Sequence, residues 1–150
     1  AIVDRLAEVL FVEAMRSRIG SSSGTDQPSW LQALDDPQIG KAIELMHAEP
    51  ARPWTIDELA RRVSMSRSAF AERFRKLTGE TPLDHLTQWR MVKAGSLMRA
   101  TPPMKLAEIA TATGYESESS FGKAFRRVMG VSPGKFRAGR MEGAFEGQAV

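Results

Sequence analysis

The sequence of 150 residues contains no cysteine and only two histidines, His47 and His85. Without cysteine there is no disulfide and no thiolate, so nothing in the composition requires an oxidising compartment. No apolar run approaches the ~20 residues that span a bilayer, and no signal peptide is visible at the first residue, an alanine. We therefore expect a cytoplasmic protein. The absent initial methionine indicates a fragment of a longer chain.

The usual marks of an enzyme are missing as well. No glycine-rich phosphate loop, metal-ligand cluster or nucleophile–base pair is visible. His47 lies in a polar stretch of predicted helix, and His85 falls where a repeat described below has Phe136, so a packed, partly buried ring is expected there. We predict that the protein is not an enzyme and that it uses no metal and no cofactor.

Charge is divided unevenly along the chain. Residues 1–49 carry four basic and eight acidic side chains, a net charge of −4. Residues 50–140 carry seventeen basic and eight acidic side chains, a net charge of +9. A basic block of this size is typical of a domain that binds a polyanion, although basic helical surfaces also occur on proteins that bind nothing.

An internal repeat dominates the rest of the sequence, and it lies in the basic block. The first copy runs from Thr55 to Pro82 and the second from Lys105 to Pro133, with one extra residue in the second copy at 115–117. Because a repeat sets the architecture, we expect two units of the same design. In matching order, Phe70, Phe74, Arg75, Lys76, Gly79 and Pro82 fall on Phe121, Phe125, Arg126, Arg127, Gly130 and Pro133.

Each copy has the pattern of a short helix, a turn and a second helix. In the first copy, Thr55 and Glu58 form a capping box that opens the first helix. Ser66 can cap the second helix, which Gly79 ends as a left-handed residue, and Pro82 then begins a third. This order is that of a helix-turn-helix, although an all-α bundle with two similar hairpins is the alternative.

The two turns are expected to differ slightly in shape. Gly114 in the second turn is free to adopt a positive φ, whereas Ser64 at the matching place has no such freedom. Ala60 and Ala110 are small where the two helices of each copy must cross closely.

The second helix of each copy carries small and hydrogen-bonding residues on the side opposite its phenylalanines. Such residues at a helix N-terminus let the backbone approach base edges in the major groove, and basic residues further along can take phosphates. A merely solvated face usually carries long charged side chains there. The residues on this side are Arg67, Ser68, Ala71, Glu72 and Arg75 in the first copy and Glu118, Ser119, Ser120, Gly122, Lys123 and Arg126 in the second.

A longer motif runs through the second copy: Ile109-Ala110, Gly114-Tyr115-Glu116-Ser117, Ser120-Phe121, Lys123-Ala124-Phe125-Arg126-Arg127, Gly130, Ser132-Pro133 and Phe136-Arg137. This motif resembles the signature of the AraC/XylS family of transcription regulators. Arg90-Met91-Val92-Lys93-Ala94 with Leu97-Met98 is similar to the long helix that joins the family's two helix-turn-helix units. The resemblance covers roughly residues 38–138.

The resemblance implies an all-α fold with two helix-turn-helix subdomains joined by a long helix. It also implies a sequence-specific regulator of transcription, usually an activator that contacts RNA polymerase. Basic residues that could reach phosphates are Arg67, Arg75, Arg126 and Arg127. By position, the family's base-reading places fall on Ser66, Ser68, Ala71 and Glu72 in the first unit and on Glu118, Ser119, Ser120, Gly122 and Lys123 in the second.

Four of these places leave alternatives open. Ala71 and Gly122 are too short for a bidentate base contact, so they would read a thymine methyl or contribute only a close approach. Glu72 and Glu118 could accept from a cytosine amino group, but an intramolecular ion pair or a helix-terminus role explains them as well.

The predicted domains follow from these patterns. Residues 1–19 read as an amphipathic helix similar to the end of a sensing and dimerisation domain, through which the chain could form a homodimer. Residues 20–35 are predicted as a linker, whose apolar end at 30–34 is expected to dock on the domain that follows. Residues 36–138 are predicted as the tandem domain and residues 139–150 as a flexible tail. Within the tandem domain we expect a first unit at 36–82, a joining helix at 83–100 and a second unit at 101–138. Such a helix is ~27 Å long, and with the width of the units it can hold two recognition helices ~34 Å apart.

Two other classes remain possible. In one, the helical hairpins bind a partner protein. In the other, the chain coats DNA without sequence preference.

Overall fold

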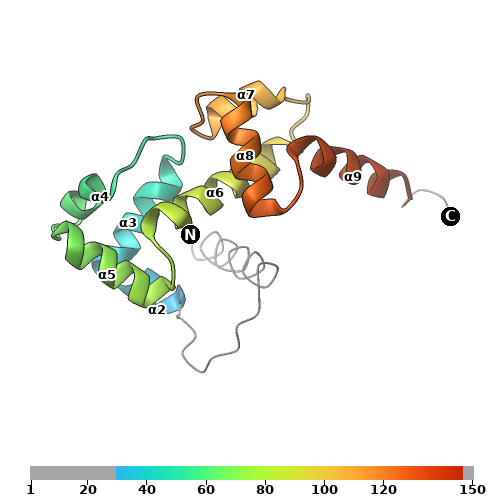
Figure 1. Cartoon of the computed structure of the whole chain (residues 1–150). Helices are drawn as coiled ribbons and strands as arrows, with labels where there is room; N and C mark the ends of the chain where they lie inside the picture. The colour runs from blue at the N-terminus through green and yellow to red at the C-terminus, as the bar shows by residue number, and fades with distance from the viewer. Residues whose placement is uncertain (1–29, 147–150) are drawn as a thin grey trace. The chain divides into compact units, whose positions relative to one another are not determined.

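The computed structural model describes residues 30–146, which form eight helices and no strand (Figure 1). The predicted all-α fold is therefore confirmed for this part of the chain. The predicted helix at 1–19 lies outside the described residues. The helices are α2 (Trp30–Asp35), α3 (Pro37–Ala48), α4 (Ile56–Arg62), α5 (Arg67–Thr78), α6 (Pro82–Leu97), α7 (Leu106–Ala112), α8 (Glu118–Met129) and α9 (Pro133–Glu146).

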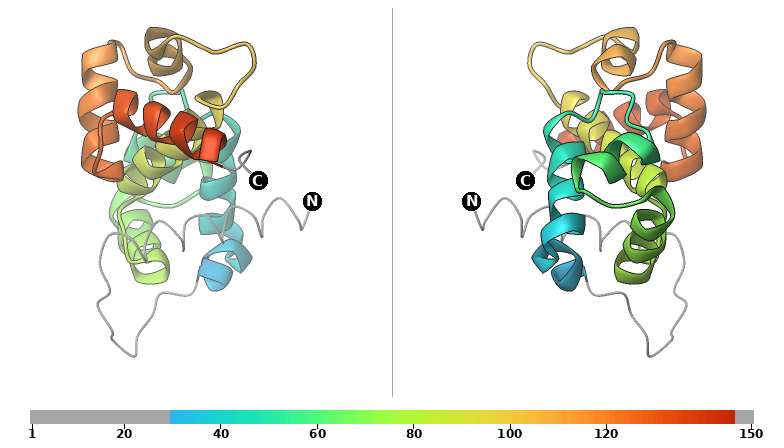
Figure 2. Two further views of the ribbon diagram at one scale, coloured as in Figure 1. Left: turned by 90° about the vertical axis from the view of Figure 1, so that its right-hand side faces the viewer. Right: turned by 90° about the vertical axis from the view of Figure 1, so that its left-hand side faces the viewer.

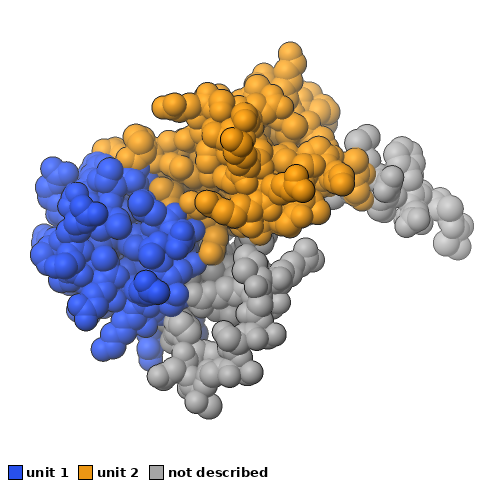
Figure 3. Space-filling view, in the orientation of Figure 1, with its two compact units in different colours: residues 1–48, 54–85 blue, residues 49–53, 86–150 orange. Residues whose placement is uncertain are grey.

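The chain divides into two compact units, each with one copy of the repeat (Figure 3). In the first unit, the described residues are 30–48 and 54–85; the second holds 49–53 and the chain from Leu86 onward. Helix α6 therefore begins in the first unit and ends in the second. Residues 49–53, which the predicted boundaries assign to the first unit, belong to the second because Arg90 holds them. Its Nε donates to the carbonyl of Pro50 at 2.7 Å, and its Nη2 donates to that of Arg52 at 3.1 Å.

Residues 30–35, which the predicted boundaries count with the linker, form helix α2 and dock on the first unit, as expected for their apolar part. Ala33 is fully buried in that unit's core, and α2 packs against both α3 and α5. Figure 2 shows α2 at the N-terminal end of α3. Because a buried alanine faces the core, this piece is anchored rather than free. The remainder of the predicted linker, 20–29, lies outside the described residues.

Asp36 joins α2, α3 and α5. One oxygen of its carboxylate, Oδ1, accepts from the amides of Gln38 and Ile39, both at 3.0 Å, and so caps α3. The other oxygen, Oδ2, forms an ion pair with Arg73 of α5, whose Nε donates to it at 2.8 Å. Burial acts to raise the pKa of Asp36, but these hydrogen bonds and the Arg73 charge outweigh it, so the pKa lies below its ordinary value.

The cores of the two units are built alike. In the first, Phe70 and Phe74 are fully buried, with ring centroids 5.9 Å apart; in the second, Phe121 and Phe125 are fully buried at 5.7 Å. A third ring completes each set. His85 lies 5.9 Å from Phe74, and Phe136 lies 5.4 Å from Phe125. The prediction of a packed ring at His85 is confirmed, since this side chain is 1% exposed.

The turns of the two helix-turn-helix units have the same backbone shape, and the predicted difference between them is wrong. Ser64 has a φ of 59°, in the left-handed region that Gly114 also occupies at 88°. In each turn the amide that follows this residue closes the loop. Met65 donates to the carbonyl of Ala60 and Tyr115 to that of Ala110, both at 2.9 Å. This hydrogen bond and the buried alanine fix the conformation of Ser64.

Gly114 has a second reason to be glycine. A Cβ at this position would lie 2.8 Å from the carbonyl oxygen of Ala51 and 2.9 Å from its Cα. The guanidinium of Arg90 lies over the ring of the next residue, Tyr115, 5.5 Å from the ring centroid. Burial raises the pKa of Tyr115, and the Arg90 charge opposes that rise. The second turn thus packs directly on residues 49–53.

Helix α6 has no single apolar stripe along its length. Leu83 is 40% exposed, whereas Met91 and Ala94 are fully buried. The two ends of this helix belong to different units, so different sides of it face a core. None of the helices among the described residues is long and apolar enough to span a bilayer.

The C-terminal segment also differs from expectation. The flexible tail predicted from residue 139 is helical as far as Glu146, because α9 begins at Pro133 and continues through fourteen residues. Alanine, arginine, methionine and glutamate are strong helix formers, and here they outweigh the glycines among them.

Candidate nucleic-acid interface

Helix α5 is the second helix of the first helix-turn-helix, and both of its ends are fixed as predicted. The side chain of Ser66 accepts from the amide of Ala69 at 3.3 Å and caps the N-terminus. Gly79 ends the helix with a φ of 78°. The preceding helix α4 opens with the hydroxyl of Thr55 accepting from the amide of Glu58 at 3.1 Å. These caps set where α5 begins, and hence which side chains stand at its N-terminus.

The predicted site residues of α5 lie on the side away from the core. Phe70 and Phe74 point inward, and Ala71 is half-buried. The other candidates are exposed: Ser66, Arg67, Ser68, Glu72 and Arg75. The first turn of this face thus presents a serine hydroxyl, an arginine and the N-terminus of the helix, where the helix dipole favours a negative group.

Two arginines of α5 have different surroundings. Nη1 of Arg67 lies 3.2 Å from Oδ2 of Asp57 in α4, and both side chains are well exposed. Arg73 is paired with the buried carboxylate of Asp36. Arg67 therefore remains accessible to a phosphate, whereas Arg73 has a structural role. Asp57 is a site residue that the sequence did not suggest, since it lies ten positions from Arg67 on another helix.

Helix α8 repeats this arrangement in the second unit. Ser117 caps it by accepting from the amide of Ser120 at 3.1 Å, and Gly130 ends it with a φ of 78°. The hydroxyl of Ser120 donates back to the carbonyl of Ser117 at 3.0 Å. Ser120 thus helps to close the first turn, while Ser119 beside it is exposed without belonging to the cap.

The predicted site residues of α8 form one face as well. Phe121 and Phe125 are fully buried on the opposite side, and Gly122 is only half-buried. A Cβ added to Gly122 would have no atom within 4 Å, so packing does not require glycine there. The exposed candidates are Glu118, Ser119, Ser120, Lys123, Arg126 and Arg127.

Within each unit the structure brings the predicted residues together on one helix face. Both faces begin with a serine cap, continue with small polar residues and end with basic ones. No group of three potential metal ligands occurs in the described part of the chain.

Each unit contains two helices joined by a turn, and the second helix of each pair is capped and exposed on one side. Two such pairs in one chain define a tandem helix-turn-helix domain. A family model described as a helix-turn-helix domain matches residues 59–139. The chain belongs to this family, in its AraC-type branch, which is a family of DNA-binding domains and not of enzymes.

Relatives and a solved structure agree with this assignment. The chain is 40% identical over 136 residues to the transcriptional regulator AlkR of Acinetobacter baylyi, a match that covers 91% of this chain and 44% of that protein. It is 37% identical to a putative AraC-like transcription regulator of Streptomyces antibioticus, over 91% of this chain and 44% of that protein. The chain thus spans less than half the length of these relatives.

Among solved structures, the fold is similar to the DNA-binding domain of AdpA, a global transcriptional factor whose structure is in complex with a target DNA. The TM-score is 0.66 at 32% sequence identity, and the match covers 76% of this chain and 99% of that one.

Proposed function

We propose that this chain is the DNA-binding part of a transcription regulator and that it binds a specific double-stranded sequence. Helices α5 and α8 would enter the major groove, with the small residues of their first turns near the base edges. The observation that carries this proposal is the matching pair of exposed faces, Ser66–Arg75 and Ser117–Arg127, on identically capped helices. The net charge of +9 over residues 50–140 supports it, because phosphate neutralisation supplies most of the affinity of such domains.

The similarity to AdpA supports the choice of duplex DNA, because that domain is described in complex with its target. The names of the similar proteins support a role in transcription. Such a protein would work in the bacterial cytoplasm, where its promoter DNA is found. Activation through contact with RNA polymerase, and a homodimer formed through residues 1–19, are finer parts of the proposal that rest on the family resemblance.

The candidate residues other than Ser66 and Ser120, which act in the helix caps, have proposed roles in contacting DNA. Ser68, Ser119 and Lys123 would donate to base edges or nearby phosphates, and Arg67, Arg75, Arg126 and Arg127 would take phosphates. Ala71 and Gly122 would allow a close approach or contact a thymine methyl, and Glu72 and Glu118 would accept from cytosine.

The test is selection from random duplex DNA, followed by footprinting of the enriched sequence across a salt series. We expect two protected segments about one helical turn, ~34 Å, apart, with an enriched motif in each. Arg67→Ala should weaken protection of one segment and Lys123→Ala that of the other. Lys41→Ala is the matched control, since Lys41 is an exposed lysine of α3 that pairs with Glu44.

Other outcomes would redirect the assignment. A single protected segment would mean that only one unit reads bases. Binding that enriches no motif and disappears with salt would indicate a nonspecific DNA-binding protein. No binding at low salt would contradict the proposal and favour a protein partner, whose affinity Arg67→Ala and Lys123→Ala should leave nearly unchanged.

A further inference from the structure

Both histidines of the chain lie in one cluster of the first unit, with His85 buried and His47 half-buried, although 38 positions separate them. Nε2 of His47, in the last turn of α3, lies 2.9 Å from Nε2 of His85, in the first turn of α6. The rings are stacked with centroids 5.1 Å apart. Nδ1 of His85 lies 3.0 Å from Oε1 of Glu80, whose side chain is 10% exposed. The DNA contacts proposed above for α5 involve none of these three side chains.

The number of protons that this cluster can hold follows from its geometry. A contact of 2.9 Å between two ring nitrogens needs one N–H and one lone pair. With Nδ1 of His85 donating to Glu80, a neutral His85 accepts from the Nε2–H of His47. A protonated His85 donates instead to Nε2 of His47. If both rings were protonated, two N–H groups would face one another and the contact would be lost.

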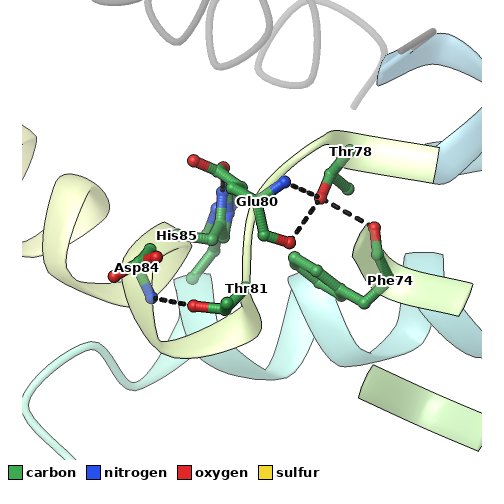
Figure 4. A network of polar contacts seen from close by, with 7 residues as sticks. Phe74, Thr78, Glu80, Thr81, Asp84 and His85 are labelled. Carbon is green, nitrogen blue, oxygen red and sulfur yellow. Dashed lines mark hydrogen bonds and ion pairs between the residues drawn. The ribbon is translucent and has the colours of Figure 1, made fainter. Parts of the chain in front are cut away.

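The cluster lies where recognition helix α5 ends. Glu80 follows the last residue of α5, Thr78, by two positions, and its amide donates to the hydroxyl of Thr78 at 3.3 Å. That hydroxyl in turn donates to the carbonyl of Phe74 at 2.8 Å. Figure 4 shows Thr78, Glu80 and His85 gathered at the turn between α5 and α6. With the Phe74 ring against His85, the cluster joins the end of α5 to α3 and α6.

We infer that His47, His85 and Glu80 form a latch that protons open, releasing the C-terminal end of recognition helix α5 in mildly acidic solution. The regulatory consequence rests on the proposed function, because binding of DNA through α5 is what the opening would weaken. The second unit carries the internal control. Phe136 occupies the place of His85 there and does not titrate, so acid should loosen the first unit alone.

The electrostatic surroundings support the latch. Burial, followed by the charge of His85, lowers the pKa of His47 to about 3. Since this value lies below the 6.5 of an unfolded histidine, the stabilisation is complete above pH 6.5 and is lost as the pH falls from there toward 3. The other charged side chains of these helices are exposed, except for the half-buried Arg90 on α6. The exposed ones are Lys41 and Glu44 on α3, Arg67, Glu72, Arg73, Arg75 and Lys76 on α5, and Asp84 and Lys93 on α6.

The first test follows amide hydrogen exchange of the whole chain at pH 7.5 and 5.5, corrected for intrinsic rates. In the wild type, the opening equilibrium constant of first-unit amides should rise about tenfold, the effect of one histidine held unprotonated against an unfolded pKa of 6.5. In His47→Gln it should not rise, because an amide offers both a donor and an acceptor to His85 and does not titrate. Equal responses of wild type and variant, or of the two units, would overturn the proposal.

A second measurement needs no variant. Because the chain has only two histidines, an NMR titration follows each ring directly. We expect the His47 ring to remain neutral down to pH 5 while the protein is folded. Two rings that both titrate near pH 6.5 in an intact fold would refute the latch.

Footprinting at the two pH values then connects the latch to DNA. Protection by the first unit should weaken at pH 5.5 in the wild type and persist in His47→Gln. Equal weakening over both segments would refute the link to α5. If the chain binds no DNA at pH 7.5, the proposed function fails, while hydrogen exchange and NMR still decide whether the latch exists.

Discussion

Ser64 and Gly114 occupy the same place in the two helix-turn-helix turns, and both have left-handed backbone, with φ of 59° and 88°. The hydrogen bonds that follow them, Met65 to Ala60 and Tyr115 to Ala110, have the same length of 2.9 Å. The turn conformation is therefore common to both units, while the residue that adopts it is not.

Substitutions at these two positions should have opposite effects. Ser64→Gly should raise the free energy of unfolding by about 0.5 kcal/mol, because relief of left-handed strain exceeds the added chain entropy of glycine. Gly114→Ala should lower it by about 2 kcal/mol or more, because the strain is joined by a clash with the backbone of Ala51. Urea denaturation would measure both; a destabilising Ser64→Gly would contradict the argument.

Gly122 should separate stability from DNA binding. It lies inside α8 with open space around it, so Gly122→Ala should stabilise the helix by about 1 kcal/mol. If this glycine lets the backbone approach DNA, the same change should weaken binding to the selected sequence. Gly95→Ala is the matched control, since Gly95 lies inside α6 and its Cβ would also meet no atom within 4 Å. An affinity equal to that of the control would rule out a close-approach role.

The exposed pair of Asp57 and Arg67 should affect binding more than folding. Asp57→Asn should change the unfolding free energy by less than about 0.5 kcal/mol, because exposed ion pairs contribute little. It should strengthen DNA binding by about twofold to fivefold at low salt, because it frees Arg67 and removes a negative charge near the phosphates. Fluorescence anisotropy would measure the affinity. A weaker complex would mean that Asp57 is needed to position Arg67.

Among the carboxylates of the first unit, Asp36 should contribute most to the free energy of unfolding. Asp36→Asn keeps an oxygen that can cap α3 but loses the charge that pairs with Arg73, so it should cost about 1–2 kcal/mol. Asp36→Ala should cost about 1 kcal/mol more, because the cap is lost too. The lowered pKa means that the charged form contributes above the ordinary value of 3.8 and that this contribution is lost as the pH falls below it. The melting temperature should therefore fall less steeply with decreasing pH in Asp36→Asn than in the wild type.

Arg126 should contribute a single phosphate contact. Arg126→Gln should reduce the slope of log affinity against log salt by about one, with nearly the same loss for specific and unrelated sequences. Lys41→Gln removes a charge from α3 and should leave the slope almost unchanged. If the two variants behaved alike, net charge rather than position would explain the effect.

The helix boundaries were largely predictable because their signals are local. Thr55, Ser66 and Ser117 cap helices through amides three residues away, and Gly79 and Gly130 end helices by their own backbone freedom. The family resemblance rests on the same regular spacing. The exposed face of each recognition helix was predictable too, since the helical period places it opposite the paired phenylalanines.

Contacts beyond the local capping and end signals were not predictable, and they account for several of the errors. The left-handed conformation of Ser64 is imposed by the loop-closing bond of Met65, and α2 is helical because Ala33 packs in a core. The pairs Asp57–Arg67 and Asp36–Arg73 join residues 10 and 37 positions apart.

The sequence by itself determined the repeat, the caps and the polar faces of α5 and α8, because each depends on residues within a few positions of one another. Only the tertiary structure decided that residues 49–53 belong with the second unit and that His47 meets His85 and Glu80. Those arrangements depend on how the helices pack, because packing brings side chains that are far apart in the sequence within hydrogen-bonding distance. A local sequence pattern does not predict such contacts.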